Sequence, residues 1–330
     1  MPRWWRLTSH AIGPAGVPDV TSPPGRILLT GAAGFVGRHL VSVLAATYPE
    51  TTLLTPTVDV RDAAAVAAIV ETELPEICIH LAGVSTVAAA RRDEDHAWQV
   101  NLHGTLHVAR AILRHAPNCQ MMFISTGDAY GAGRAGESID EAAPLAPTNV
   151  YAATKAAADL ALGSMAGQGL RVVRLRPFNH TGPGQSAEFV VPAFARQIVR
   201  IAAGLQPPLL EVGNLDTWRD FLDVRDICAG YAACVARRNE LTSGVILNLC
   251  SGTARKIANV LAELLTLAGI VAEVRSDPSR MRAAAVQCSP GNAARARELL
   301  GWAPTTPWTQ TLRDVLEYWR ARIAASPTGA

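Results

Sequence analysis

Three glycines at three-residue spacing, Gly31, Gly34 and Gly37, follow an apolar run at residues 26–30 and open a segment of helical periodicity at 37–48. In such a turn, Gly31 permits a tight bend, Gly34 lets a phosphate approach the backbone, and Gly37 lets the helix pack closely on the strand. A phosphate is favoured there because backbone N–H groups and the helix dipole point at it. The pattern predicts a strand–turn–helix unit that binds a dinucleotide pyrophosphate; the alternative is a glycine-rich turn without a ligand.

Apolar runs of strand length alternate with alanine-rich helical segments through the first half of the chain. This alternation predicts a parallel sheet with helices on both faces. The expected strands are 26–30, 52–55, 77–81, 121–125 and 170–175, and the expected helices are 37–48, 63–73, 96–115 and 151–166. After Phe178 the pattern predicts a smaller lobe with helices at 190–203, from about 224, and at 257–268, 292–300 and 312–323, and with strands at 210–212 and 245–249.

The fold class expected from this order is α/β, with a doubly wound parallel sheet (Rossmann fold) and a smaller C-terminal α/β lobe that binds the substrate. Residues 1–24 are expected to be a flexible tail, because they lack the apolar block of a signal peptide. The dinucleotide-binding domain is expected at 25–180, with 221–250 returning to it. Residues 181–220 and 251–330 are expected to form the substrate lobe.

Composition gives no argument for nucleic acid or a membrane as a partner. The 30 basic and 28 acidic residues leave a formal charge of +2 and form no basic block. No run of 18 apolar residues occurs, so no transmembrane helix is expected. The six cysteines form no Cys-x-x-Cys pair, and several lie in apolar runs, which predicts reduced, buried thiols in a cytoplasmic protein.

Tyr151 and Lys155 lie four residues apart on a predicted helix and therefore on one face. Lys155 is notable because Lys256 is the only other lysine in the chain. A positive charge close to the phenol is expected to lower its pKa from about 10 and to make a usable acid or base near neutral pH. The alternative is an exposed surface pair.

Thr126 and Asp128 follow the fourth predicted strand, at the sheet edge where α/β proteins bind ligands. Thr126 offers a hydroxyl to a substrate carbonyl. Asp128 is either a second polar group in the same crevice or a turn residue. His103 and His107 have metal-ligand spacing, but no third ligand is apparent, so no metal site is expected.

The sequence leaves NADP and NAD both open as cofactor, with a tilt toward NADP. An acidic residue about 20 positions after the glycines normally binds the ribose 2′-hydroxyl of NAD. Asp59 lies after the second strand has ended, so we expect it to contact the adenine instead. The free strand end would accommodate a 2′-phosphate, with Arg38 or Arg61 as a partner.

The order of these motifs resembles the extended short-chain dehydrogenase/reductase superfamily, and the second half resembles its GDP-6-deoxy-D-mannose reductases. The superfamily motifs are Gly31-x-x-Gly34-x-x-Gly37, Asp59-x-x-Asp62, His80-Leu-Ala-Gly83, Asn101-Leu-His-Gly-Thr105, Ser125-Thr-Gly-Asp-Ala-Tyr-Gly131 and Tyr151-x-x-x-Lys155. The more specific segments are residues 176–185, 189–192, 212–216, 219–226 and 277–282.

The resemblance implies roles for individual residues. Thr126, Tyr151 and Lys155 would be catalytic, with Asp128 beside them. The dinucleotide would contact Gly31, Gly34, Phe35, Val36, Gly37, Asp59, Val60, Leu81, Ala82, Gly83, Asn101, Tyr151, Lys155 and Phe178. A GDP-sugar would contact Thr126, Gly127, Asn179, Val190, Arg219, Arg280 and Arg282, because arginine forks pair bidentately with phosphate oxygens.

The activity implied is NAD(P)H-dependent reduction of the 4-keto group of GDP-4-keto-6-deoxy-D-mannose to GDP-6-deoxy-D-mannose, also called GDP-D-rhamnose. A homodimer is also implied, with helices 96–115 and 151–166 forming a four-helix interface. One alternative is a GDP-mannose 4,6-dehydratase, which usually carries a glutamate at the position of Asp128. Others are a reductase that forms the C4 epimer GDP-6-deoxy-talose and a non-catalytic dinucleotide sensor, which would not need Tyr151 and Lys155 together.

Overall fold

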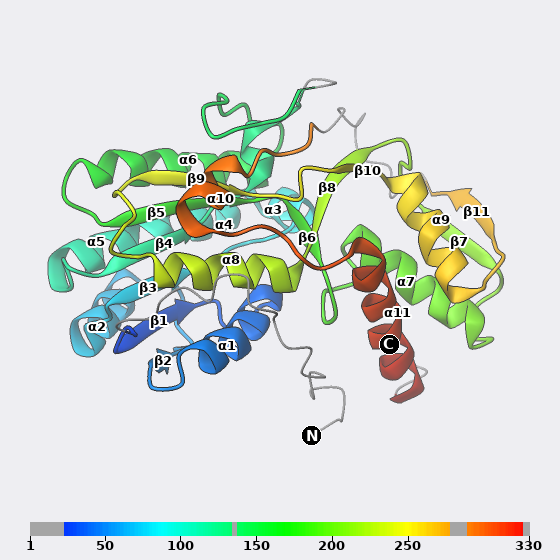
Figure 1. Cartoon of the computed structure of the whole chain (residues 1–330), viewed down its shortest axis with the longest axis horizontal. Coiled ribbons are helices and arrows are strands. Elements are labelled where there is room, and N and C mark those ends of the chain that lie inside the picture. The colour runs from blue at the N-terminus through cyan, green and yellow to red at the C-terminus, as the bar shows by residue number, and fades with distance from the viewer. Residues whose placement is uncertain (1–22, 134–136, 278–288, 326–330) are drawn as a thin grey trace.

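A computed structural model describes residues 23–133, 137–277 and 289–325 of the chain. Its larger part is a parallel sheet with the strand order β2-β1-β3-β4-β5-β9 (Figure 1). The strands are β1 (Arg26–Thr30), β2 (Thr52–Leu54), β3 (Ile77–His80), β4 (Gln120–Ile124), β5 (Val172–Pro177) and β9 (Val245–Leu249). The order reverses between β1 and β3, and open α/β sheets bind ligands beyond the carboxyl ends of the strands at such a point.

Helices cover both faces of this sheet (Figure 1). One layer contains α1 (Phe35–Thr47), α8 (Val224–Ala236) and α10 (Ala294–Leu300), and the other contains α2 (Ala63–Glu73), α5 (Thr105–His115) and α6 (Val150–Ala166). In β1, Ile27 and Leu29 pack in the first layer and Leu28 in the second. Both faces of the strands are therefore buried, which explains their uninterrupted apolar runs.

The predicted helix at 96–115 is interrupted in the structure. After α3 (Val87–Arg92), the chain forms α4 (Glu94–Trp98), a π-helical segment η2 (Gln99–Gly104), and only then α5. The side chain of Asn101 explains the irregularity, because it accepts a hydrogen bond from Val84 N (2.8 Å) and donates to Val84 O (3.2 Å) and Thr154 Oγ1 (2.9 Å). Such π-segments inside helices are frequent at functional sites.

The second half contains two small sheets and a separate apolar core. One sheet has the order β10-β8-β6, formed by β6 (Asn179–Thr181), β8 (Trp218–Asp223) and β10 (Ala254–Lys256), and the other pairs β7 (Leu209–Val212) with β11 (Glu273–Ser276). The core lies among α7 (Val190–Ala202), α9 (Ile257–Ala268) and α11 (Trp308–Ala325). We did not predict β6, β8, β10 or β11, because β6, β10 and β11 have only three or four residues and the six residues of β8 include three charged ones.

The described cysteines are buried, free thiols: Cys78, Cys119, Cys228, Cys234 and Cys250. Burial raises the pKa of the Cys78 thiol to about 12. Cys288 and residues 1–22 of the predicted tail lie outside the described residues. Within the described ranges, none of the helices combines the length and the apolar character that a bilayer crossing requires.

Candidate active site

The structure brings the predicted residues of the first half to one edge of the large sheet. Because the strands are parallel, the segments that follow them share the carboxyl edge. These segments are the turn after β1 (Gly31, Gly34, Phe35, Val36, Gly37), Asp59 and Val60 beyond β2, Leu81, Ala82 and Gly83 after β3, Thr126, Gly127 and Asp128 after β4, and Phe178 after β5.

The glycine turn has the geometry that a pyrophosphate requires. Gly31 has a φ of +73°, and a Cβ at this position would lie 2.6 Å from Ala82 N in the loop after β3. A Cβ on Gly37 would lie 2.5 Å from the carbonyl oxygen of Ala32. Gly34 begins α1 without a side-chain cap, and the first helical turn contains no acidic residue. The first N–H groups of α1 are therefore suited to bind an anion.

The buried side chain of His80 connects this turn to the irregular helix. His80 Nδ1 lies 2.8 Å from Thr30 Oγ1, and Nε2 lies 3.0 Å from Thr105 Oγ1. Thr105 Oγ1 donates to Asn101 O (2.7 Å), so it accepts from Nε2–H. Thr30 Oγ1, which accepts from Ala82 N (3.3 Å), then donates to Nδ1. The network thus assigns a neutral imidazole with its proton on Nε2.

We expect His80 to make the fold sensitive to acid. Burial, together with the charge of Lys155, lowers the pKa of His80 to about 3. In the unfolded chain, a histidine binds a proton below about pH 6.5, whereas folded His80 stays neutral down to its lowered pKa. Above pH 6.5 His80 therefore costs the folded state nothing, and between that pH and the folded pKa it lowers the free energy of unfolding as the pH falls. In urea unfolding, we expect His80 to lower the free energy of unfolding by up to about 1.4 kcal/mol per pH unit below pH 6.

The matched control is His80→Gln, which offers a donor and an acceptor but does not titrate. Between pH 7.5 and pH 5, its unfolding free energy should decline less steeply than that of the wild type. Equal slopes for the two proteins would show that His80 does not cause the acid sensitivity.

The two arginines considered for a 2′-phosphate both have partners in the structure. Arg61 pairs with Asp59 through Nε (3.0 Å) and Nη2 (2.6 Å). These hydrogen bonds lower the pKa of Asp59 to about 2. Among the described residues, the Arg38 side chain donates to two carbonyl oxygens, those of Ala33 and Gly184, and to no carboxylate. Arg61 is therefore neutralised, whereas Arg38 keeps its net positive charge beside the glycine turn.

Thr126 and Tyr151 meet at the carboxyl end of β4. Thr126 caps a short 3₁₀-helix, η3 (Gly127–Tyr130), where its hydroxyl accepts from Asp128 N (3.1 Å). Tyr151 lies in the first turn of α6, and its phenol is close enough to the Thr126 side chain to interact with it. Burial and the Asp128 carboxylate raise the pKa of Tyr151 above its usual value, although the interaction with Thr126 opposes this. The prediction of a lowered phenol pKa was therefore wrong.

The position of the Lys155 side chain explains why its charge does not lower the pKa of the Tyr151 phenol. Its Nζ lies 4.5 Å from the centroid of the Phe123 ring, and the side chain is only 6% exposed. Burial lowers the pKa of Lys155 to about 8, while the Asp159 charge acts in the opposite direction. The ammonium remains charged at neutral pH, but its charged neighbour is Asp159.

Asp159 is a fully buried carboxylate that anchors α6 to β5. It accepts from Arg176 Nε and Nη2 (2.9 Å each) and from Arg174 Nη1 (3.1 Å). Arg176 also donates to Tyr130 Oη (2.9 Å). Burial alone would raise the pKa of Asp159, but the hydrogen bonds and charges of the two arginines have the larger effect and lower it below its usual range. This network holds the helix that carries Tyr151 and Lys155.

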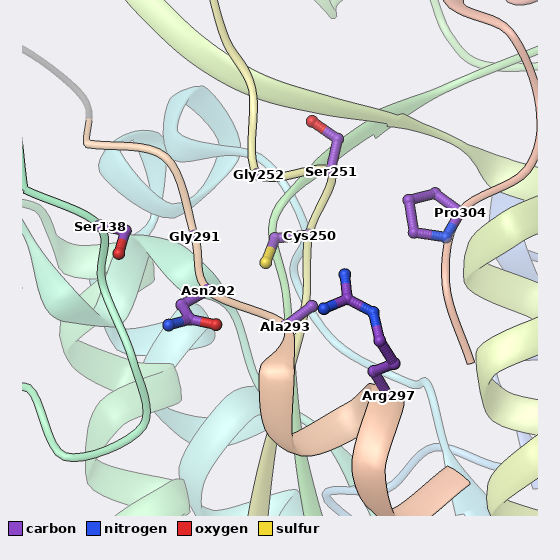
Figure 2. Close-up of a pocket in the computed structure, with 9 residues that line it drawn as sticks. All are labelled: Ser138, Cys250, Ser251, Gly252, Gly291, Asn292, Ala293, Arg297 and Pro304. Carbon is purple, nitrogen blue, oxygen red and sulfur yellow. The ribbon is translucent and has the colours of Figure 1, made fainter. Parts of the chain in front are cut away.

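Phe178 occupies a space that two glycines leave open. A Cβ on Gly127 would lie 2.9 Å from its ring, and one on Gly291 would lie 2.8 Å from it. Gly291 also lines a cavity of about 150 Å³, and Arg297 extends from α10 at the side of that cavity (Figure 2). The lining residues are Ser138, Cys250, Ser251, Gly252, Gly291, Asn292, Ala293, Arg297 and Pro304.

A buried carboxylate supports one wall of this cavity. Asp220 in β8 accepts from the main-chain N–H groups of Ser251 (2.9 Å), Gly252 (3.0 Å) and Gly291 (3.0 Å). The Ser251 hydroxyl donates to the same side chain. Asp220 therefore fixes two loops that are distant in sequence.

Asn179 and Arg219 share one face of the sheet β10-β8-β6. Asn179 pairs with Phe221 across the parallel strands β6 and β8, and Arg219 lies two residues before Phe221. Because side chains alternate along a strand, Asp220 points to the opposite face. Arg219 lies inside β8, one of the strands that the sequence did not predict. Val190 begins α7, and Arg280 and Arg282 lie outside the described residues.

The two histidines with metal-ligand spacing occupy different helical segments. His103 belongs to η2, and His107 in α5 donates from Nδ1 to Val60 O (3.0 Å). In the part of the chain that the structure describes, no three His, Cys, Asp or Glu side chains are grouped as a metal site would require.

The sequence analysis missed the Asp159 network and the role of Asp220. The partners of Asp159 are 15 and 17 residues away, and Gly291 is 71 residues from Asp220. No local motif encodes contacts over such separations. The available signal was the pair Arg174 and Arg176 within an otherwise apolar run, because a charge inside a buried strand requires a partner.

A doubly wound sheet, an uncapped helix after a glycine turn, and a tyrosine beside a threonine at the sheet edge define a class of nucleotide-dependent enzymes. Residues 27–250 match the NAD dependent epimerase/dehydratase family, and the chain belongs to it. The resemblance to extended short-chain dehydrogenases/reductases and the expected Rossmann fold are confirmed.

Individual relatives are similar over nearly the whole chain. GDP-6-deoxy-D-mannose reductase of Pseudomonas aeruginosa is 38% identical, covering 90% of this chain and 98% of the relative. The solved structure of RMD from Pseudomonas aeruginosa complexed with NADPH has a TM-score of 0.83 and 36% identity, covering 90% of this chain and 99% of that one. Human dTDP-D-glucose 4,6-dehydratase is 26% identical, covering 89% of this chain and 90% of the relative.

Proposed function

We propose that this protein reduces the 4-keto group of GDP-4-keto-6-deoxy-D-mannose and forms GDP-6-deoxy-D-mannose. The observation that carries the proposal is the 38% identity to a GDP-6-deoxy-D-mannose reductase over 90% of the chain. The site supports it, because a protonated phenol and a second hydroxyl lie together at the ligand-binding edge of the sheet. The lower identity of 26% to the dehydratase favours reduction over dehydration.

The residues around the glycine turn fit a nicotinamide dinucleotide. The uncapped start of α1 would hold the pyrophosphate, and Gly31 and Gly37 leave room where a Cβ would collide with backbone. We propose NADP as the preferred cofactor, because Arg38 keeps a net positive charge beside this turn and the solved relative was complexed with NADPH. When bound, the reduced nicotinamide supplies the hydride that the ketone carbon accepts.

Three side chains of this protein would handle the proton and the charge. Tyr151 would donate its proton to the carbonyl oxygen, and its raised pKa keeps the phenol protonated until the substrate is present. Thr126 would donate a hydrogen bond to the same oxygen and polarise it. Lys155, with a pKa of about 8, would remain cationic at neutral pH and donate hydrogen bonds to the nicotinamide ribose.

Cofactor absorbance tests this proposal. Adding GDP-4-keto-6-deoxy-D-mannose to the enzyme with NADPH should cause a steady loss of NADPH absorbance, and NADH in place of NADPH should react more slowly. GDP-mannose should cause no loss. Conversion of GDP-mannose to the 4-keto sugar without net consumption of cofactor would instead show a dehydratase.

We also propose a cytoplasmic homodimer that uses α5 and α6 as a four-helix interface. Leu160 projects from α6 and is 60% exposed, and Ala153, Ala157 and Ala161 lie near it at helical spacing, partly exposed. Small side chains allow helices of two subunits to pack closely. The buried, free thiols suit a reducing compartment.

Light scattering at micromolar concentration should give a mass of twice 34.9 kDa for the wild type. Leu160→Arg should shift the mass toward one chain, because a charge would then be buried in the interface. A wild-type mass of a single chain would contradict the dimer.

A further inference from the structure

Two arginines face each other across the ladder of β8 and β10. The strands are antiparallel, and Arg255 pairs with Arg219. Side chains of directly opposed residues lie on the same face with their Cβ atoms about 4.5–5.5 Å apart, and like charges in such a pair are destabilising. This arrangement calls for a neutralising anion.

Neither arginine finds that anion among the described residues. Arg219 donates from Nη1 to the main-chain oxygen of Trp218 (2.7 Å). The side chain of Arg255 has no hydrogen bond or ion pair in this part of the chain, and its Nε is buried without a partner. The adjacent Lys256, on the opposite face, does have a charged partner, because its Nζ forms an ion pair with Asp216 at 2.8 Å.

Nearby carboxylates do not supply the missing charge. Burial lowers the pKa of Arg255, and the charges of Glu263 and Asp220 oppose this only from a distance. Asp220 points to the other face of β8, where it accepts four hydrogen bonds from Ser251, Gly252 and Gly291. The arginine pair therefore retains its net positive charge.

The guanidinium of Arg255 lies over an aromatic ring. Its Cζ is 4.9 Å from the centroid of the Trp308 ring. Trp308 in turn stacks on Phe221, with centroids 5.5 Å apart and an interplanar angle of 21°. A guanidinium over an aromatic face keeps N–H groups available, and the contact reduces the entropy lost when it binds an anion.

The pair lies on the face that also carries Asn179. Asn179 pairs with Phe221. Arg219 comes two residues earlier in β8, about 7 Å from Phe221 along the strand at about 3.3 Å per residue. Asn179 follows Phe178 at the carboxyl end of β5, so the face begins at the candidate active site. A hexose at the active site could span this distance and bring an attached diphosphate to the arginines.

We propose that Arg255 is a substrate-binding residue that, together with Arg219, holds the diphosphate of the nucleotide-sugar. The inference rests on the proposed function for the nucleotide-sugar itself, and it adds Arg255 to the phosphate contact that the resemblance implies for Arg219. Two guanidinium groups can supply several charge-assisted hydrogen bonds to the diphosphate oxygens.

The test measures the binding of GDP and of guanosine by calorimetry, with NADP⁺ present. Arg255→Met removes the guanidinium but retains an unbranched side chain that can cover the Trp308 ring. We expect the Kd for GDP to rise about 10- to 100-fold, with the affinities for guanosine and NADPH unchanged. Arg255→Lys, which keeps the charge but loses the fork, should give a smaller increase.

Lys256→Ala is the matched control, because it removes a positive charge from the next residue on the opposite face. Its Kd for GDP should stay within about twofold of the wild type, because its charge is already paired in the exposed ion pair with Asp216. An Arg255→Met protein with an unchanged Tm and an unchanged Kd for GDP would overturn the proposal. Equal weakening of GDP, guanosine and NADPH binding would also overturn it, by assigning Arg255 a role in the fold.

The same titrations separate this inference from the proposed substrate. If the wild type binds UDP or dTDP more tightly than GDP, the proposed GDP-sugar substrate is wrong. Arg255→Met should still weaken binding of the preferred nucleoside diphosphate relative to its nucleoside. A loss confined to diphosphates supports the arginine pair whichever base the protein prefers.

Discussion

Tyr151→Phe should reduce the turnover of the 4-keto sugar by about 10² or more, which is the scale of general acid catalysis. The change removes one oxygen from a side chain that lies beside Thr126 at the carboxyl edge of the sheet. The ring can keep its packing, so the fold should be preserved and the affinity for NADPH should change far less than turnover. Single-turnover kinetics and calorimetric titration of the cofactor would measure the two effects separately.

Tyr318→Phe provides the control for this substitution. Tyr318 lies in α11, where its hydroxyl accepts from Arg322 Nη1 (2.9 Å), far along the chain from the candidate site. Its turnover should equal that of the wild type. If Tyr151→Phe kept turnover within a factor of about three, well short of the scale of general acid catalysis, Tyr151 would not be the proton donor.

Asp159→Ala should have the largest effect on stability, a loss of about 3–5 kcal/mol in the free energy of unfolding. The carboxylate is fully buried and accepts three hydrogen bonds from the side chains of Arg174 and Arg176. Its removal would leave two guanidinium groups without a counter-charge in a low-dielectric interior. Urea unfolding at pH 7.5 would measure the loss.

Asp216→Ala is the matched comparison, because it also removes one carboxylate from an ion pair. The side chain of Asp216 is 84% exposed, and its pair with Lys256 should contribute less than about 1 kcal/mol. A loss of that size for Asp159→Ala would show that the arginines are stabilised by other groups.

The sequence predicts the large sheet well because its strands are encoded locally. The runs that begin at Arg26 and Ile77 are buried on both faces, and continuous apolar segments of that length between helical segments indicate a parallel sheet. The glycine turn is also encoded mainly in local sequence, because Gly34 and Gly37 meet the backbone of their own turn, and only Gly31 meets a distant segment, at Ala82 after β3. The predicted cluster at the sheet edge follows from parallel topology alone.

Other features depend on partners that only the folded chain supplies. Burial and Asp128 raise the phenol pKa of Tyr151, and the ammonium four residues away does not lower it but lies over Phe123. The break in the predicted helix at 96–115 depends on the contacts of Asn101 with Val84 and Thr154. No periodicity within one segment contains that information.

The arginine pair is a further example. Arg255 and Arg219 are 36 residues apart, and only the register of β10 on β8 places them opposite each other. In sequence, Arg255 and Lys256 are two adjacent basic residues with the same apparent role. In the structure they lie on opposite faces, one with an ion-pair partner and one without.

Isotope transfer tests the proposed reduction most directly. The enzyme would be given GDP-4-keto-6-deoxy-D-mannose and NADPH deuterated at C4 of the nicotinamide, and the product would be analysed by mass spectrometry and NMR. The account predicts one deuterium, attached to C4 of a sugar nucleotide that matches GDP-6-deoxy-D-mannose. A product without deuterium at C4 would contradict the proposed reduction, and deuterium at C4 of the talose epimer would contradict the proposed product.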